Sequence, residues 1–463
     1  MPTAKAKYDA ALQIVAELRS HGFEAYLAGG CVRDLALDRE PHDYDVATSA
    51  TPDVVLAMFP RTFAVGAHFG VVLVASSDED SGPDRFTTEV ATFRSDGAYS
   101  DGRHPDAVRY TLSPEEDVRR RDFTINGLLL DPFIETPGHC SPAPPTEGIL
   151  DFVGGLADLE AGVVRAIGRA ETRFEEDHLR MLRAVRFAAR FGFEIEPGTL
   201  AAIRALASRI HAVSRERVRD ELTKMLTEGR ARRAFELLDK TGLLAEVLPE
   251  IERMKGVEQP PEFHPEGDVW THTLILLEQL LPGCSPSLAW GALLHDVGKP
   301  ATFRRAPDRI RFDGHVEVGA AIAAEVCRRF RFSNDETRLV LSLVEQHMRF
   351  MDAQRMKTST LKRFLRQENF DEHLALHRMD CMAAHGKLDI YNFVRQQHET
   401  MPEETMRPAP LITGRELIAA GYQPGPRFRE VLAAIEDAQL DGAITTAEEA
   451  LTLARTQLRE PGH

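Results

Sequence analysis

The period of the hydrophobic pattern changes once along the chain, and this change limits the fold more than any other feature. Between residues 23 and 130, short β-rich runs alternate with amphipathic segments, which is typical of strands mixed with helices. From about residue 155 onward, apolar residues recur at helical spacing almost throughout. A chain of 463 residues is also too long for a single hydrophobic core. The sequence therefore predicts a small α+β head followed by all-helical domains.

Individual elements can be predicted within this frame. Four runs in the head are predicted strands, and they read FEAYLAGG, DYDVAT, FGVVLVA and FTTEVATF. Helices are predicted over residues 8–21, 31–37 and 52–59, the last after a threonine cap followed by proline. Further along, EEDHLRMLRAVRFAARFGF (175–193) predicts one strongly amphipathic helix.

Two proline-rich loops mark candidate domain boundaries. One reads TPGHCSPAPPTEG (136–148) and the other VEQPPEFHPEGD (257–268). We expect four domains: a head over 1–150, a helical neck over 151–256, a histidine-bearing helical domain over 257–400 and a helical tail over 401–463.

Composition excludes several classes of protein. No apolar run approaches the ~20 residues needed to cross a membrane, and the N-terminus has no signal-peptide pattern. The five cysteines are scattered and form no C-x-x-C motif, which indicates a reducing compartment and predicts a cytoplasmic protein. The oligomeric state is not predicted.

The net charge of −16 argues against a nucleic-acid binder, but the charge is unevenly distributed. Residues 161–233 contain sixteen Lys/Arg and ten Asp/Glu. One basic stripe is enough to bind a phosphate backbone, because the local field matters more than the total charge. A solvated helical surface explains the same charges equally well.

A glycine pair precedes a pair of carboxylates near the start of the head. Gly29 and Gly30 allow the backbone to approach phosphates closely, with the following helix N-terminus and Arg33 as further phosphate contacts. Asp43 and Asp45 point to the same side if their segment is a strand, because strand side chains alternate. Two such carboxylates can bind Mg²⁺ ions that bridge a triphosphate. Glu89, on another predicted strand, is a candidate third acid, although an outward-facing glutamate is equally consistent with the pattern.

Longer motifs resemble a known family. The opening GGCVRD and DYD are followed by SDGAYSDGRHP (95–105), RRRDFTINGLLLDP (119–132), DFVGGLADLEAGVVRAIG (151–168) and RFEEDHLRMLRAVRFAARFGF (173–193). Together they resemble the class II (bacterial-type) tRNA nucleotidyltransferase and poly(A) polymerase family over residues 23–235, and they look most like its CCA-adding members. The resemblance implies a polymerase-β-like nucleotidyltransferase head with a small mixed β-sheet, followed by an all-α neck.

The resemblance also implies roles for individual residues. Arg121, Asp122 and Asn126 match the motif that recognises the ribose and helps hold the triphosphate. A second set, Glu176, Asp177 and Arg180 with Arg183 one turn further on, matches the motif that selects the base. Residues 94–105 correspond to a flexible loop that helps switch the specificity from C to A.

The base-selecting motif has a physical rationale. Asp177 and Arg180 are three residues apart, so on one helix they share a face. Cytosine and adenine both present an amino donor beside a ring-nitrogen acceptor, which suits one carboxylate and one guanidinium. Uracil and guanine mismatch both contacts, and unpaired buried polar groups reject a wrong substrate strongly. Without the family motif, a surface salt bridge is the simpler interpretation of this pair.

Histidines in the second half form another pattern. The segments WTHTLILLEQL, LAWGALLHDVGKPATF, FDGHVEVGA, LVEQHMRF and LHRMDCMAAHG resemble an HD-type metal phosphohydrolase domain. The resemblance implies His272, His295, Asp296 and Asp380 as ligands, with His315 and His347 completing a second metal position and Lys299 following the HD pair. Imidazole and carboxylate ligands suit Mn, Ni, Fe or Zn. His264 is a rival first ligand, and His373 and His377 are interpreted as structural or solvent-facing.

The leading hypothesis is a template-independent enzyme that adds C and A from CTP and ATP to the 3′ end of tRNA, with Mg²⁺ at the acid pair. Addition of only the terminal A, and poly(A) synthesis, are alternatives within the family. Poly(A) polymerases of this family carry a GRRF-like motif where this chain reads VGAHFGVVLV, which weighs against poly(A) synthesis. Enzymes that add only CC lack the flexible loop, so its presence here weighs against that activity. A hypothesis of another class is an HD phosphodiesterase or phosphatase whose head only binds nucleotide or RNA.

Overall fold

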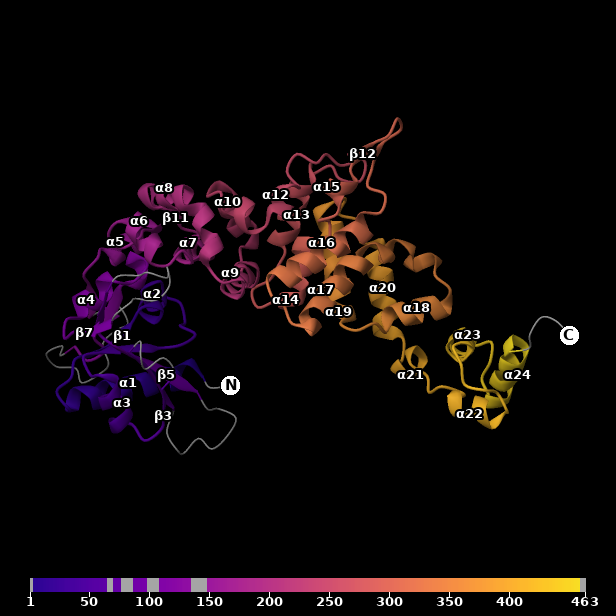
Figure 1. Cartoon of the computed structure of the whole chain (residues 1–463), viewed down its shortest axis with the longest axis horizontal. Helices are drawn as coiled ribbons and strands as arrows, with labels where there is room; N and C mark the ends of the chain where they lie inside the picture. The colour runs from indigo at the N-terminus through magenta and orange to yellow at the C-terminus, as the bar shows by residue number, and fades with distance from the viewer. Residues whose placement is uncertain (1–2, 65–69, 76–85, 98–107, 135–147, 459–463) are drawn as a thin grey trace. The chain divides into compact units, whose positions relative to one another are not determined.

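The computed structural model describes residues 3–64, 70–75, 86–97, 108–134 and 148–458. The chain divides into two compact units, the first ending at Pro249 and the second beginning at Glu250. This boundary lies close to the predicted end of the neck at residue 256, and the finer division into four domains stays a prediction. Figure 1 shows strands mainly in the first unit, and a short two-stranded hairpin in the second.

A mixed β-sheet is the framework of the first unit. Strands β2 and β5 are parallel, whereas the other neighbouring pairs in this sheet are antiparallel. In their order across the sheet, the strands are β3 (Thr62–Phe63), β4 (Val71–Ala75), β5 (Thr87–Thr92), β2 (Asp45–Thr48), β1 (Ala25–Ala28), β8 (Leu128–Leu130) and β9 (Ile149–Asp151). The predicted mixed sheet is therefore confirmed, and the four predicted strands are β1, β2, β4 and β5.

Helices alternate with the strands of the head, and further helices form the neck. The head contains α1 (Ala4–Ser20), α2 (Gly30–Ala36), α3 (Pro52–Met58) and α4 (Pro114–Arg119), so the three helices predicted there are confirmed to within a few residues. The neck contains α5 (Gly155–Ala161), α6 (Ala170–Glu176), α7 (Arg180–Phe191), α8 (Pro197–Leu206), α9 (Arg215–Thr227), α10 (Ala231–Lys240) and α11 (Leu243–Val247).

The single helix predicted over residues 175–193 is wrong. Helix α6 ends at Glu176, and Asp177 adopts an extended conformation with φ −146° and ψ 105°. The Asp177 carboxylate accepts a hydrogen bond from the backbone N–H of Leu179 at 3.0 Å, just before α7 begins. A short acidic side chain competes for backbone donors in this way, which favours a helix boundary over a helix interior.

The second unit is helical apart from its hairpin. Its longer helices are α13 (Val269–Glu278), α14 (Pro286–Leu294), α16 (His315–Arg329), α17 (Asn334–Gln346), α18 (Thr358–Leu365), α19 (Phe370–Ala383), α20 (Asp389–Thr400), α23 (Arg427–Leu440) and α24 (Ala447–Leu458). Shorter helices are α12 (Pro249–Glu252), α15 (Lys299–Thr302), α21 (Glu403–Met406) and α22 (Gly414–Ala419). Among the described residues, no helix is both long and apolar enough to cross a membrane.

Within this unit, two hydrophobic clusters are separate. One gathers around Phe350, Phe364 and Phe370, and the other around Leu417 and Ile435. A separate cluster after residue 411 is consistent with the predicted tail.

A buried ion pair joins two helices of the neck. The Arg186 Nε on α7 donates to Glu221 Oε2 on α9 at 2.6 Å, and both side chains are almost fully buried. We expect Arg186→Met to lower the free energy of unfolding of the first unit by about 3–5 kcal/mol, because Glu221 is left charged and buried. Calorimetric melting measures this loss.

Two variants serve as controls for this ion pair. Arg232→Met removes an exposed pair with Glu236 and should cost less than about 1 kcal/mol. The double variant Arg186→Met/Glu221→Leu should recover much of the lost stability. Equal losses for Arg186→Met and Arg232→Met would contradict this account.

Candidate active site and metal centre

The parallel register of β2 and β5 places two predicted acids together. Val46 pairs with Val90, so Asp45 and Glu89 are the preceding residues on neighbouring strands. Side chains at matched positions of adjacent strands point to the same face of a sheet. Both residues line the same cleft, so the structure brings together the second and third predicted acids.

The cleft has a volume of about 610 Å³ and collects most of the predicted nucleotide-site residues. Eleven of them line it: Gly29, Gly30, Arg33, Asp45, Glu89, Arg121, Asp122, Asn126, Asp177, Arg180 and Arg183. Asp43 and Glu176 are not among its lining residues. Further arginines, Arg94, Arg120 and Arg217, also line the cleft, so cationic side chains face the two acids.

The acids repel each other in the absence of a cation. Burial and then the charge of Glu89 raise the pKa of Asp45 to about 7. Burial also raises the pKa of Glu89, and Arg121 only partly opposes this effect. Two carboxylates with raised pKa values on one face fit a divalent cation, which would remove the repulsion.

Asp43 is engaged outside the cleft. Its Oδ1 accepts a hydrogen bond from Lys7 Nζ at 2.8 Å, and its Oδ2 lies 2.7 Å from His42 Nδ1. Partial burial would raise the pKa of Asp43, but the bonds from Lys7 and His42 outweigh burial, and the pKa is lowered. Strand β2 begins only at Asp45, so the predicted strand over 43–48 is two residues too long, and the alternation argument for Asp43 does not apply.

Position 29 requires glycine for two reasons, its backbone conformation and the close approach of Arg121. Its φ is +73°, a left-handed value that favours glycine, and a Cβ there would lie 2.9 Å from Arg121 Nη1. Arg121 donates to Asp117 Oδ2 at 2.9 Å, whereas its buried Nε has no hydrogen-bond partner among the described residues. The glycine therefore makes room for a guanidinium that lines the cleft.

A buried hydrogen-bond network holds the residues that are predicted to recognise the ribose. The Asp122 Oδ1 accepts from Asn126 Nδ2 at 3.0 Å, and its Oδ2 accepts from Arg183 Nε at 2.8 Å. Asn126 Oδ1 in turn accepts from Arg33 Nη1 at 2.5 Å. Burial would raise the pKa of Asp122, but Arg183 and Asn126 lower it to about 2. Arg33 is only 4% exposed and also bonds Asp34, which favours a positioning role over the predicted direct phosphate contact.

Three of the residues predicted to select the base, Asp177, Arg180 and Arg183, line the cleft, but Asp177 and Arg180 do not share a helix face. Asp177 Oδ2 accepts from Arg217 Nη2 on α9 at 2.7 Å, whereas Arg180 Nη1 donates to Glu176 Oε2 at 2.6 Å. The shared helix face inferred for Asp177 and Arg180 is wrong because the helix breaks between them. Arg217 lies 40 residues from Asp177, and no local pattern in the sequence indicates the contact. The predicted flexible loop (94–105) is described only at residues 94–97, which include strand β6 (Arg94–Asp96), and residues 98–105 lie outside the described residues.

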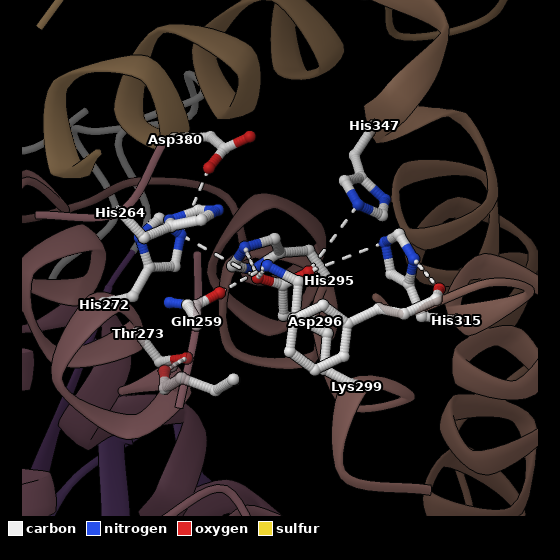
Figure 2. Close-up of polar contacts among 12 residues, drawn as sticks. Gln259, His264, His272, Thr273, His295, Asp296, Lys299, His315, His347 and Asp380 are labelled. Carbon is white, nitrogen blue, oxygen red and sulfur yellow. Dashed lines mark hydrogen bonds and ion pairs between the residues drawn. The ribbon is translucent and has the colours of Figure 1, made fainter. Parts of the chain in front are cut away.

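The six predicted ligands of the second unit converge on one point, as Figure 2 shows. Asp296 lies at the centre, with Oδ2 at 3.2 Å from His295 Nε2 and 3.9 Å from His272 Nε2. Its other oxygen, Oδ1, lies 3.8 Å from both His315 Nε2 and His347 Nε2. Asp380 Oδ1 lies 3.1 Å from His272 Nε2. This cluster of six residues, termed the histidine cluster below, has Asp296 in two potential metal-binding groups.

Hydrogen bonds to backbone carbonyls fix the orientation of three of the imidazole rings. The Nδ1 atoms of His295, His315 and His347 each lie 2.7–3.0 Å from the backbone carbonyl three residues earlier. A carbonyl only accepts, so each of these Nδ1 atoms carries a proton, which leaves Nε2 as the ring nitrogen that can bind a metal. The buried Nε2 atoms of all four histidines have no hydrogen-bond partner among the described residues. Imidazole nitrogens that converge on shared carboxylates in this way fit a divalent metal.

Residues outside the predicted set support this cluster. Glu266 Oε1 lies 2.7 Å from His272 Nδ1 and 2.9 Å from His264 Nδ1, so His264 contacts the cluster indirectly. Lys299 Nζ lies 2.7 Å from both Asp296 Oδ2 and Gln259 Oε1. The sequence offers no spacing signal for Glu266 or Gln259, because both lie in the proline-rich loop.

The two histidines of α19 outside the cluster are both buried. His373 and His377 are 2% and 3% exposed. His377 stacks on Phe350 with a centroid distance of 4.3 Å. Their structural interpretation is therefore consistent with the geometry, and the solvent-facing alternative is wrong.

Comparisons with known proteins agree along the chain. The family described as "Poly A polymerase head domain" matches residues 25–165, and "Probable RNA and SrmB- binding site of polymerase A" matches residues 192–255. A third family, "tRNA nucleotidyltransferase domain 2 putative", matches residues 315–454.

Whole proteins and solved structures extend this agreement. A CCA-adding enzyme of Lactobacillus johnsonii is 38% identical over 275 residues, covering 58% of this chain and 64% of that enzyme. A CCA-adding enzyme of Streptococcus pneumoniae is 30% identical over 447 residues, covering 96% of each chain. The crystal structure of the Bacillus stearothermophilus CCA-adding enzyme in complex with CTP superposes with a TM-score of 0.70 at 26% identity and 97% coverage of both chains. The chain therefore belongs to the CCA-adding enzyme family of tRNA nucleotidyltransferases.

Proposed function

We propose that the cleft of the first unit adds C and A nucleotides from CTP and ATP to the 3′ end of tRNA and releases pyrophosphate. The observation that carries this proposal is the juxtaposition of Asp45 and Glu89 with a wall of arginines in one cleft. Relatives that match over most of the chain are CCA-adding enzymes, and the solved relative in complex with CTP supports a nucleoside triphosphate as ligand.

The chain's own residues supply positioning and charge. Asp45 and Glu89, joined by Asp43 once it leaves Lys7, would hold Mg²⁺. Bound there, Mg²⁺ lowers the pKa of the attacking 3′-hydroxyl and stabilises the pyrophosphate leaving group. Arg121 and Arg180 would contact the triphosphate and the base, while Asp122, Asn126 and Arg183 would fix the ribose. Positioning and electrostatics then lower the barrier, as in phosphoryl transfer generally.

The proposal is tested by separating chemistry from binding. We expect Asp43→Ala and Asp45→Ala each to lower nucleotide incorporation at least ~10³-fold, because the cation loses a ligand. Binding of tRNA, measured by filter retention, should stay within about threefold of the wild type, because the tRNA backbone contacts the basic neck. An equal loss of incorporation and tRNA binding would contradict the assigned roles.

Cation binding predicts a specific change in stability. The pKa of Asp45 is about 7 in the folded protein, against 3.8 for a freely exposed aspartate, so the folded state holds this proton more tightly. The contribution of Asp45 to the free energy of unfolding therefore falls as the pH rises from about 4 to 7. At pH 8 without Mg²⁺, we expect Asp45→Asn to melt ~2–4 °C above the wild type, because the variant carries no buried charge.

Adding Mg²⁺ provides the control for that experiment. The wild type should gain stability on addition of Mg²⁺, whereas Asp45→Asn should gain much less, because one ligand has lost its charge. A variant that melts below the wild type at pH 8 without metal would overturn this account of Asp45.

Base selection depends on how Arg180 is held. Its guanidinium is fixed by Glu176, while Asp177 is fixed by Arg217. We expect Arg180→Ala to reduce the preference for CTP and ATP over UTP and GTP by about 10- to 100-fold, and Glu176→Gln to do so less strongly. Competition between labelled nucleotides measures the preference. Asp220→Asn, on the exposed surface beside Arg219, is the matched control, and an unchanged preference in Arg180→Ala would exclude the role.

Two alternative activities within the family differ in the nucleotides that are added to the RNA. Addition of the terminal A alone uses the same cleft, and its loop (94–105) lies mostly outside the described residues. Poly(A) synthesis is disfavoured by the stretch 65–74, which lacks the GRRF-like motif. A head that only binds nucleotide is disfavoured by Asp45 and Glu89, since a binding site has no need of two adjacent carboxylates with raised pKa values.

We propose a second activity, metal-dependent phosphoester hydrolysis, at the histidine cluster. The observation that favours it is the set of four buried Nε2 atoms that have no hydrogen-bond partners among the described residues around Asp296. Mn, Ni, Fe or Zn would be held by His272, His295, Asp296 and Asp380, with His315 and His347 completing a second position that shares Asp296. Bound there, such a metal would supply an activated water as the nucleophile.

Metal content and hydrolysis test this second proposal together. We expect the protein loaded with Mn²⁺ or Ni²⁺ to hydrolyse a generic phosphodiester, and Asp296→Ala to lose both the bound metal and the activity. Glu266→Gln should lower metal affinity by about 10- to 100-fold, because His272 loses its orienting carboxylate. Glu325→Gln, at an exposed pair with Arg328, is the matched control. Equal hydrolysis by the wild type and Asp296→Ala would exclude the site.

A further inference from the structure

A basic hairpin joins two ligand-bearing segments of the histidine cluster. Strands β12 (Arg304–Arg305) and β13 (Ile310–Arg311) pair antiparallel, with Arg304 opposite Arg311. The hairpin follows the segment of Asp296 and Lys299 and leads directly into His315, the first residue of α16. Figure 1 shows it projecting from the helices of the second unit.

The base of the hairpin contacts the cluster. The Phe312 carbonyl lies 3.0 Å from His315 Nδ1 and so fixes that imidazole. Lys299 Nζ, which bonds Asp296, lies 5.4 Å from the centroid of the Phe312 ring. On the other side, Arg305 Nη2 donates to Glu258 at 2.6 Å, next to the Gln259 that bonds Lys299. A ligand bound along the hairpin is thereby led to the metal-binding residues.

The exposed part of the hairpin combines positive charge with an aromatic ring. Residues 303–313 contain four arginines and two aspartates, in a chain whose net charge is −16. Phe303 is 38% exposed and packs against Phe312 with a centroid distance of 6.0 Å. Arginines that bind phosphates, beside aromatic rings on which bases stack, are typical of surfaces that bind single-stranded nucleic acid.

The arginines of the hairpin form surface ion pairs that a phosphate group can displace. Arg304, Arg305 and Arg311 pair with Asp313, Glu258 and Asp308 at 2.6–2.8 Å. These pairs lie largely on the surface, where an ion pair contributes little, so a phosphate group can compete for the guanidinium.

We propose that this hairpin binds a single-stranded RNA end and presents its terminal phosphoester to the histidine cluster. The inference rests on the hydrolysis proposed for that cluster, and it names the substrate class as polynucleotide ends in preference to mononucleotides. RNA is the occupant that fits, because phosphates match the arginines and bases match Phe303. It also accords with the match of residues 192–255 to a family described as "Probable RNA and SrmB- binding site of polymerase A".

The test compares two substrates with the same scissile group. A hexaribonucleotide and a mononucleotide, each with a 3′-terminal phosphomonoester, are hydrolysed by the Mn²⁺-loaded full chain. In the variant Arg304→Gln/Arg305→Gln/Arg309→Gln, we expect kcat/KM for the hexanucleotide to fall at least tenfold more than kcat/KM for the mononucleotide. The slope of log kcat/KM against log salt should become shallower by about 2, at ~0.7 for each phosphate that the variant no longer binds. Equal losses for both substrates, or no loss, overturn the proposal.

A control and a binding measurement complete the test. Arg415→Gln/Arg429→Gln/Arg455→Gln removes the same charge from exposed positions of the tail and should leave the ratio of the two substrates unchanged. Photo-crosslinking of a hexaribonucleotide containing 4-thiouridine, mapped by mass spectrometry, should give adducts within residues 303–313. If neither substrate is hydrolysed, the hydrolytic proposal alone fails and the adducts decide the role of the hairpin. Adducts only elsewhere exclude RNA binding by the hairpin.

Discussion

The first unit depends on the buried carboxylate of Asp122. It accepts hydrogen bonds from Asn126 in the head and from Arg183 on helix α7, and Asn126 passes the connection to Arg33 on helix α2. A charge-assisted network of this kind is strong when every member is satisfied and costly when one is missing. The sheet that carries Asp45 and Glu89 and the helix that carries Arg180 are thus held in one geometry.

Both candidate sites contain buried polar groups whose burial costs free energy when no cation is bound. In the cleft, Asp45 and Glu89 share one face of the sheet, and their pKa values are raised. At the histidine cluster, four imidazole nitrogens are buried without hydrogen-bond partners among the described residues. A bound cation offsets both costs, because it neutralises adjacent carboxylates in one place and accepts lone pairs in the other. The types of ligand differ accordingly, with oxygen in the head and mainly nitrogen in the second unit.

Local sequence patterns predicted what depends on local structure. Alternation and turn residues placed β1, β2, β4 and β5, and the long family motifs identified the residues that line the cleft. The break at Asp177 was missed, because the apolar period continues across it and only the carboxylate bond to Leu179 interrupts the helix. The position of Asp43 was also missed, since it depends on Lys7, 36 residues earlier in the chain.

Supporting residues were harder to predict than ligands. The six residues of the histidine cluster were found from the order of short motifs, whereas Glu266 and Gln259 lie in a proline-rich loop with no periodic pattern. Arg217 is one of many arginines on the neck, and only the packing of α9 against α7 gives it a role. Contacts between distant segments are set by tertiary packing, which a single sequence does not reveal.

The central claim is that the cleft builds the CCA end of tRNA without a template, and the sequence of the product tests this most directly. Three tRNAs lacking CCA, CA or A are incubated with the wild-type chain and all four nucleoside triphosphates, and their 3′ ends are sequenced. This account predicts that all three end in CCA, with no further nucleotides added. Extension of only the tRNA that lacks the final A, or long A tails on any of them, would contradict it.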